Sequence, residues 1–250
     1  MRSTRRSSLD ITHLPWDSEL FGIKVYQVSE NVTLTPARLP RLIKELLDNQ
    51  VDLLYYLHDA KRSRDVYTLT ASGFRFIDTR IVLNIELKSA KITDTVPWFQ
   101  LVKRNAGQVN LKPLIAMSKD LAATSRFSAD RLLKKTLILK MYKTWILKSL
   151  EFEMADYWFG LGTPSDPFTF VTFKTIRPGE VSLSLIATRR DLRRKGYGSA
   201  LLRHAFQALL AKKVNRVRVG MQLTNTKALA FYEKMGFRSV GSWYIFHWHR

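Results

Sequence analysis

The sequence predicts a mixed α/β fold in which helices flank a mostly antiparallel central sheet. Apolar and polar residues alternate along Val181–Ile186, which is typical of a half-buried strand. Apolar residues then recur at helical spacing from Leu201 to Leu210, which is typical of an amphipathic helix. The turn-forming stretches Gly162–Pro167 and Pro178-Gly179 join neighbouring apolar runs as hairpins. Helices that alternate with hairpin-joined strands favour a mixed sheet.

The composition indicates a folded protein with a strongly basic surface. The chain has 250 residues, of which 46% are hydrophobic, enough for one large domain or two modest ones. Its formal net charge of +20 fits an anionic partner (nucleic acid, anionic lipid or a polyphosphate ligand) or a solvated basic surface. Cysteine is absent, which excludes disulfides, a thiolate zinc site and a cysteinyl acyl-enzyme; no metal site is predicted. We find no signal-peptide or membrane-spanning pattern and expect a cytoplasmic protein.

The N-terminal half begins with a basic, Ser-rich tail, residues 1–10, which we expect to be disordered. The next segment, Leu14–Gly22, contains two aromatic and two acidic residues and a closing glycine. It is either a packed turn or a place where a carboxylate, Asp17, lies at the mouth of a ligand site. After it we predict a strand 23–28, a helix 37–49 and a strand 51–57.

A short pattern occurs twice in the chain. Leu69-x-x-Ser72-Gly73-Phe74-Arg75 has the same layout as Tyr232-x-x-Met235-Gly236-Phe237-Arg238, and an apolar strand follows each copy, 80–86 in the first case. Residues 11–88 are therefore interpreted as a truncated first copy of the C-terminal unit. Because leucine replaces tyrosine and no Arg-x-x-Gly-x-Gly precedes it, the first copy is expected to form a scaffold or one wall of the site.

Between the two copies the pattern is weaker. We interpret the polar stretch 89–112 as a linker and 113–250 as the second domain, with a helix over 111–121 and a loop over 125–130. A long helix follows from Leu132, with apolar residues on one side and lysines largely outside that stripe. It either packs on the core with a solvated lysine face or lies on a membrane.

The segment after Val181–Ile186 carries the strongest functional signal. Arg193-x-x-Gly196-x-Gly198 leads from that strand into the helix that contains Leu201 and Leu210. Glycines let the backbone approach an anion, and the free amides and dipole at a helix N-terminus attract it. The pattern predicts a pyrophosphate cradle. A glycine-rich turn without a ligand is the alternative, because Gly-x-Gly alone is a weak signal and the third glycine of the dinucleotide fingerprint is missing.

A second motif follows the strand 216–223. Asn225–Phe237 (NTKALAFYEKMGF) is predicted as a short helix capped by Asn225 and closed by Gly236, before a final aromatic-rich strand 239–248. In order and spacing, the two motifs resemble the GCN5-related N-acetyltransferase (GNAT) family. The resemblance implies the GNAT fold and acetyl-CoA as co-substrate. It also implies that Asn225 binds the pantetheine arm and that Tyr232 lies beside the thioester sulfur. Without the resemblance, Tyr232 would be interpreted as an aromatic residue of the core.

The resemblance extends to further cofactor and substrate residues. Asp78 is the expected general base, with Asp17 as the alternative, and none of the five histidines lies in a motif. In the chain's second half, backbone amides of the glycine-containing loop would hold the pyrophosphate. The side chains of Arg193 and Arg194 would contact the outer phosphates, and the backbone of the strand that precedes the loop would pair with the pantetheine. The expected cofactor-binding residues are Leu185, Ile186, Ala187, Arg193, Arg194, Lys195, Gly196, Tyr197, Gly198, Ser199 and Asn225.

Across most of the chain, the sequence is similar to the dTDP-fucosamine N-acetyltransferase group of that family. The shared features include the Trp-Asp opening around Asp17 and the Ser-Arg-Phe loop, which implies that Asp17, Arg126 and Phe127 contact the sugar nucleotide. The predicted reaction is direct acetyl transfer from acetyl-CoA to the amine of a nucleotide-linked aminodeoxy sugar used in surface polysaccharide. The alternatives are a GNAT enzyme for a protein N-terminus, a lysine or another small amine, and a basic nucleic-acid-binding module on an inert GNAT fold. Whether the chain forms a homodimer is left open.

Overall fold

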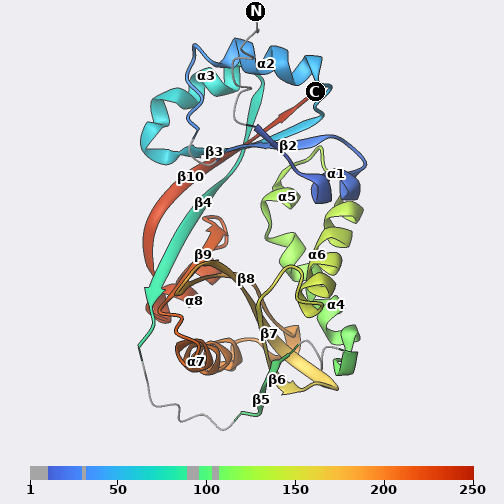
Figure 1. Ribbon diagram of the computed structural model, residues 1–250, viewed down its shortest axis with the longest axis vertical. Helices are drawn as coiled ribbons and strands as arrows, with labels where there is room; N and C mark the ends of the chain where they lie inside the picture. Colours follow the sequence, from blue (N-terminus) through green and yellow to red (C-terminus); the bar gives the residue numbers. More distant parts are fainter. Residues whose placement is uncertain (1–10, 30–31, 89–95, 103–106) are drawn as a thin grey trace, which may run out of the picture. The chain divides into compact units, whose positions relative to one another are not determined.

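The computed structural model describes residues 11–29, 32–88, 96–102 and 107–250, and the expected tail 1–10 lies outside them. The described residues form two compact units (Figure 1). The first comprises residues up to Arg80 together with Ser242–Arg250, and the second comprises Ile81–Gly241. Two long strands, β4 (Phe74–Glu86) and β10 (Arg238–His249), each contribute residues to both units.

The first unit is a small sheet with the strand order β1-β2-β3-β10-β4. Strands β2 and β3 are parallel, whereas β10 runs antiparallel to β3, with His247 opposite Tyr55. The helices bury Leu42, Leu46 and Leu69 in one apolar cluster. The remaining elements are β1 (Ile11–His13), α1 (Pro15–Phe21), β2 (Val25–Val28), α2 (Leu39–Asp48), β3 (Leu53–Asp59), η1 (Ala60–Asp65) and α3 (Val66–Ala71).

The repeated pattern has the same local structure in both copies. Gly73 follows α3 with φ +86°, and Gly236 follows α8 (Thr226–Lys234) with φ +93°. Each glycine ends its helix in the left-handed region, where a side chain is strained, and the chain enters a strand directly. For this reason β4 starts at Phe74, earlier than the expected strand 80–86.

The second unit has the strand order β4-β9-β8-β7-β6-β5. Helix α7 packs on β6, β7 and β8, and α4 and α6 lie on the other side of these strands (Figure 1). The core includes Leu201, Leu202, Ala205 and Leu209, so the helical spacing in the sequence correctly identified the buried face of α7. Its further elements are β5 (Trp98–Leu101), α4 (Leu111–Ala123), α5 (Arg126–Ala129), α6 (Lys135–Leu150), β6 (Tyr157–Thr163), β7 (Asp166–Arg177), β8 (Glu180–Thr188), η3 (Arg190–Leu192), α7 (Tyr197–Leu210) and β9 (Arg216–Gln222).

Three local expectations differ from the structure. Part of the stretch expected as a linker, Trp98–Leu101, is β5, which pairs antiparallel with β6 and so satisfies backbone hydrogen-bonding groups of both strands. The expected loop 125–130 contains the short helix α5, which the Ser125 side chain caps by accepting a hydrogen bond from Ser128 N at 3.3 Å. The expected turn Leu14–Gly22 is helix α1, which ends at Gly22 with φ +68°.

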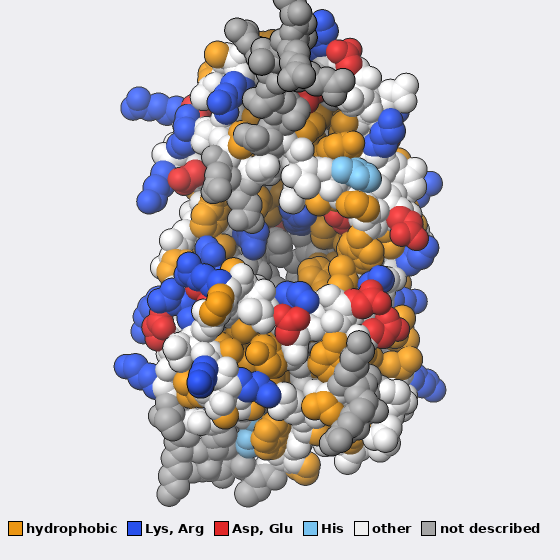
Figure 2. Space-filling model, in the orientation of Figure 1, with side chains coloured by type: hydrophobic (Ala, Val, Ile, Leu, Met, Phe, Trp, Pro, Cys, Tyr) orange, Lys and Arg blue, Asp and Glu red, His pale blue; other side chains and the backbone are white. Residues whose placement is uncertain are grey.

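The surface agrees with the composition. Lys and Arg side chains are scattered over the face shown in Figure 2, among apolar and uncharged ones, as a formal net charge of +20 leads one to expect. Among the described residues, no helix combines the length and the apolar character that a bilayer span requires.

Candidate active site

The turn between β8 and α7 has the geometry of an anion-binding helix N-terminus. Gly196 is the N-cap residue of α7, with φ +85°, and no side chain caps the helix there. The first amides of a helix lack intrahelical acceptors, and the helix dipole adds partial positive charge at this end. The amides of Tyr197, Gly198 and Ser199 at the start of α7 could therefore bind an anion.

The two glycines of the turn serve different purposes. A Cβ built on Gly196 would meet no atom within 4 Å, so this position requires glycine for its backbone conformation. A Cβ on Gly198 would lie 3.4 Å from the Phe231 ring, so this position packs directly against α8. Gly198 thus packs against the protein itself, whereas Gly196 leaves the approach to the turn open.

Strand β8 separates from its parallel neighbour just before this turn. Pairing with β9 runs from Glu180↔Arg216 to Leu183↔Val219, although both strands continue further. The register with β7 shifts at the same point, since Thr172 is opposite Leu185 and Phe173 is opposite Leu183. This skips one residue of β8, and such a bulge bends the strand. Within the described residues, the later part of β8 therefore has no strand partner on its β9 side.

Of the three β8 residues expected to bind the pantetheine, only one directs its backbone groups toward the edge of β8 at which pairing with β9 has ended. The Leu185 amide donates to Thr172 Oγ1 on β7 at 3.1 Å, so it faces away from β9. Because backbone groups of successive strand residues point to opposite sides, the Ala187 groups face β7 as well, and those of Ile186 face the open side. Ile186 is therefore the position at which an extended ligand could pair with β8.

The basic residues of the turn differ in their partners. The Arg193 guanidinium donates from Nε to Thr188 O at 2.9 Å and from Nη2 to the Asp120 carboxylate. Arg194 is exposed with φ +61°, a conformation that costs a side chain strain energy. Among the described residues, neither Arg194 nor Lys195 pairs with a carboxylate. The side chains free to meet an outer phosphate are thus Arg194 and Lys195, while the Arg193 guanidinium is engaged by Thr188 O and Asp120.

The second motif is helix α8 and the residues beside it. Asn225 caps α8, as predicted, by accepting a hydrogen bond from Ala228 N at 3.2 Å, and this contact uses its Oδ1 rather than its Nδ2. Tyr232 is 4% exposed, and its ring packs against Phe231 and Phe237 at centroid distances of 5.2 Å. Burial raises the pKa of the Tyr232 phenol well above its ordinary value. Tyr232 therefore keeps its proton at any pH at which an enzyme works.

The expected acids and substrate residues are distributed over both units. Asp78 is a buried residue of β4 in the first unit, where it accepts a hydrogen bond from Thr79 N at 2.7 Å. Asp17 lies half-buried in the first turn of α1 in the same unit. Arg126 and Phe127 form the start of α5 in the second unit, with the guanidinium 4.7 Å from the Phe127 ring centroid. Asp78 and Tyr232 belong to different units, and their pairing stays a prediction.

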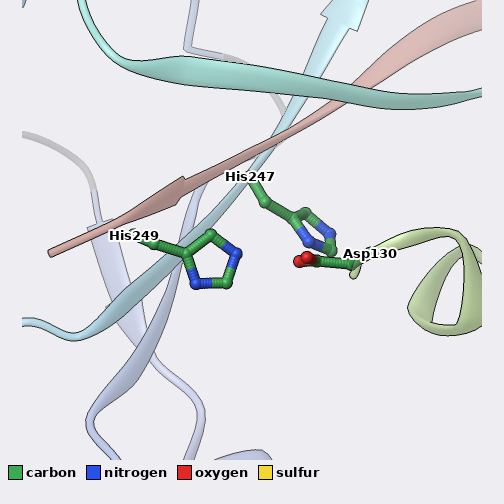
Figure 3. Close-up of side chains that lie close together, drawn as sticks. All are labelled: Asp130, His247 and His249. Atoms are coloured by element: carbon green, nitrogen blue, oxygen red, sulfur yellow. The ribbon is translucent and has the colours of Figure 1, made fainter. Parts of the chain in front are cut away.

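Histidines occur in both units, without a motif in the sequence. Figure 3 shows His247 and His249 on β10, with ring centroids 6.2 Å apart. His247 is buried and also packs on Tyr55. In the second unit the buried His204 of α7 stacks on Trp98 with a centroid distance of 5.1 Å. The ring contacts of His204 with Trp98 and of His247 with Tyr55 are typical of packed aromatic side chains.

Sequence reasoning missed Asp120. Its carboxylate lies on α4 and accepts hydrogen bonds from Arg190 and Arg193 of the glycine turn, which are 70 and 73 residues away along the chain. Asp120 belongs to no motif and sits in an ordinary amphipathic pattern. Only the packing of α4 against β7 and β8 brings it to the turn.

Together, these features define an α/β protein in which the parallel strands β8 and β9 separate and the uncapped N-terminus of α7 follows β8. Comparison with known proteins agrees with this class. Residues 139–237 match the model of the acetyltransferase (GNAT) family. Over 248 residues the chain is 20% identical to the spore coat polysaccharide biosynthesis protein SpsD of Bacillus subtilis (strain 168), covering 93% of this chain and 80% of that protein.

Two solved structures are similar across nearly the whole chain. One is a conserved protein of unknown function from Staphylococcus epidermidis ATCC 12228, with TM-score 0.66, 13% identity, and coverage of 98% of this chain and 93% of that one. The other is a GCN5-related N-acetyltransferase from Sphaerobacter thermophilus, with TM-score 0.63, 12% identity, and coverage of 96% and 76%. The predicted GNAT fold is confirmed. The segment 139–237, which contains the glycine turn and α8, is similar to GNAT acetyltransferases.

Proposed function

We propose that this protein transfers the acetyl group of acetyl-CoA directly to the amine of a nucleotide-linked aminodeoxy sugar destined for a surface polysaccharide. The observation that carries the donor half is the open helix N-terminus at Gly196 (φ +85°), next to the separation of β8 from β9. The acceptor half is supported by the similarity to a spore coat polysaccharide biosynthesis protein and by the resemblance to dTDP-fucosamine N-acetyltransferases. Since acetyl-CoA is available in the cytoplasm, we place the reaction there.

The donor would bind along β8 and across the start of α7. The α7 amides would hold the pyrophosphate, and the exposed Arg194 and Lys195 would meet its outer phosphates. The backbone of Ile186 would pair with the pantetheine as an added strand does. Asn225 would add a hydrogen bond from Nδ2, because its Oδ1 is already used in capping α8.

The chemistry would then proceed in one displacement, and the chain has no cysteine that could form an acyl-enzyme instead. The free amine attacks the thioester carbonyl, a C–N bond forms, and the C–S bond breaks with its electron pair on sulfur. The protonated Tyr232 phenol would donate a hydrogen bond that strengthens as negative charge grows on the sulfur. The proton lost by the amine would leave through a carboxylate.

Asp78 is the proposed acceptor of that proton, and Asp17 is the alternative. Asp78→Asn removes the base, so kcat/KM for the amine should fall about 100-fold while acetyl-CoA affinity stays unchanged. Asp17→Asn should lower kcat/KM by less than about tenfold, mainly through KM, if Asp17 only contacts the sugar. Steady-state kinetics of both variants decides between them. A larger loss of kcat in Asp17→Asn would exchange the two roles.

The acceptor class can be tested with purified protein. We expect acetyl transfer, detected by mass spectrometry, in a panel of dTDP- and UDP-linked aminosugars incubated with acetyl-CoA. A panel of peptides with free N-termini and lysines is the control and should remain unmodified. Acetylated peptides without acetylated sugars would favour the protein-acetylating alternative. If RNA but not acetyl-CoA raises the Tm, the nucleic-acid-binding alternative holds.

A further inference from the structure

Asp120 connects helix α4 to the glycine turn through two arginines. It accepts hydrogen bonds from Arg190 Nε at 2.9 and 3.1 Å, and from Nη2 of both Arg190 and Arg193. The Asp120 side chain is only 19% exposed, so it is held mostly inside the protein. The hydrogen bond from Arg190 is the main reason that the pKa of the Asp120 carboxyl lies below its ordinary value, and contact with Arg193 acts in the same direction. Asp120 is therefore ionised at neutral pH.

Of the two arginines, Arg193 is the one through which Asp120 can restrain the glycine turn. Its Nε is bonded to Thr188 O, the last residue of β8, while its Nη2 is bonded to Asp120. One guanidinium thus ties together the end of β8, helix α4 and the residue three positions before Gly196. Arg190 is 76% exposed, and an ion pair with so exposed a partner adds little order because water and salt screen it.

Other acidic residues near the turn have different partners. Asp191 and Asp166 both pair with Arg189, through Nε at 3.0 Å and Nη1 at 3.2 Å. Asp191 lies on the turn itself and is 63% exposed. Its removal would change the charge of the turn by the same amount as removal of Asp120, without releasing Arg190 or Arg193. The chain therefore provides a matched control for any general electrostatic effect.

We infer that Asp120 is a positioning residue for acetyl-CoA, which acts through Arg193 to hold the turn so that the first amides of α7 face the pyrophosphate. Asp120 does not touch the ligand. The inference rests on the proposed acetyl-CoA site at this turn. A carboxylate near an anion site also repels the anion, but that repulsion is offset by the two guanidinium groups that it binds. Loss of order in the turn is therefore the larger effect of removing it.

Calorimetric titration of the full chain with acetyl-CoA tests this role. Asp120→Asn should raise the Kd about fivefold to tenfold, since the turn must be ordered on binding. Asp191→Asn should change the Kd less than about twofold, and Asp120→Glu should restore part of the affinity. Arg193→Gln should weaken binding as Asp120→Asn does. The double variant should be no weaker than Arg193→Gln alone, because both changes break the same contact.

A second measurement reports on the turn directly. Amide hydrogen exchange of the segment 189–199 without ligand should be faster in Asp120→Asn than in the wild type and unchanged in Asp191→Asn. The inference is overturned by unchanged or tighter binding in Asp120→Asn, by equal losses in Asp120→Asn and Asp191→Asn, or by additive losses in the double variant. If the wild type itself does not bind acetyl-CoA, the proposed function fails instead.

Discussion

Replacing Tyr232 with phenylalanine is expected to lower kcat about 100-fold and to leave the Kd of acetyl-CoA within about twofold of the wild type. The hydroxyl would contribute only as charge develops on the departing sulfur, so its loss affects the transition state more than the ground state. The ring remains packed on Phe231 and Phe237, which preserves the fold. Steady-state kinetics with the best acceptor and calorimetric titration with acetyl-CoA measure the two quantities.

Tyr157→Phe is the control for this prediction, because it removes a partly buried phenol at the start of β6 in the same unit. Its kcat should stay unchanged. Since burial raises the pKa of Tyr232, the wild-type pH–rate profile should show no loss of activity from ionisation of this phenol below about pH 10. Weaker acetyl-CoA binding with normal kcat in Tyr232→Phe would contradict a role of the phenol in stabilising the departing sulfur.

Gly196→Ala is expected to raise the Kd of acetyl-CoA roughly 30- to 150-fold, which corresponds to about 2–3 kcal/mol. Gly196 has φ +85°, where an alanine is strained, so the turn should shift towards another backbone conformation. The first amides of α7 would then point away from the pyrophosphate, and charge-assisted hydrogen bonds would be lost. Calorimetric titration gives the Kd, and a thermal scan gives the Tm.

Gly179→Ala is the matched control for Gly196→Ala. Gly179 has φ +78° and space for a Cβ, and it lies in the turn that enters β8 at the opposite end from Gly196. Both variants should lose about 1–2 kcal/mol of folding free energy from backbone strain. Only Gly196→Ala should lose affinity. Equal Kd values in the two variants would mean that acetyl-CoA does not bind at the start of α7.

Residues close together in the chain carried most of the successful predictions. The buried face of α7, the Asn225 cap and the helix-closing Gly236 follow from spacing and from backbone sterics within a few residues. The resemblance to the GNAT family also depends on two short motifs, and it was sufficient to predict the fold. The roles of Tyr232, Asp78 and the sugar-contacting residues remain predictions.

Other features of the site arise from contacts between distant parts of the chain. Strand β5 exists because β6 offers it a partner, and the bulge that separates β8 from β9 depends on the register with β7. Asp120 reaches Arg193 across 73 residues. A sequence pattern reports which face of an element is apolar, but not which carboxylate will meet which guanidinium once the elements pack. Local backbone chemistry therefore made the strand-to-helix turn at Gly196 predictable from the sequence. The contact of Asp120 with Arg193 became visible only in the folded protein, since long-range packing brings these two side chains together.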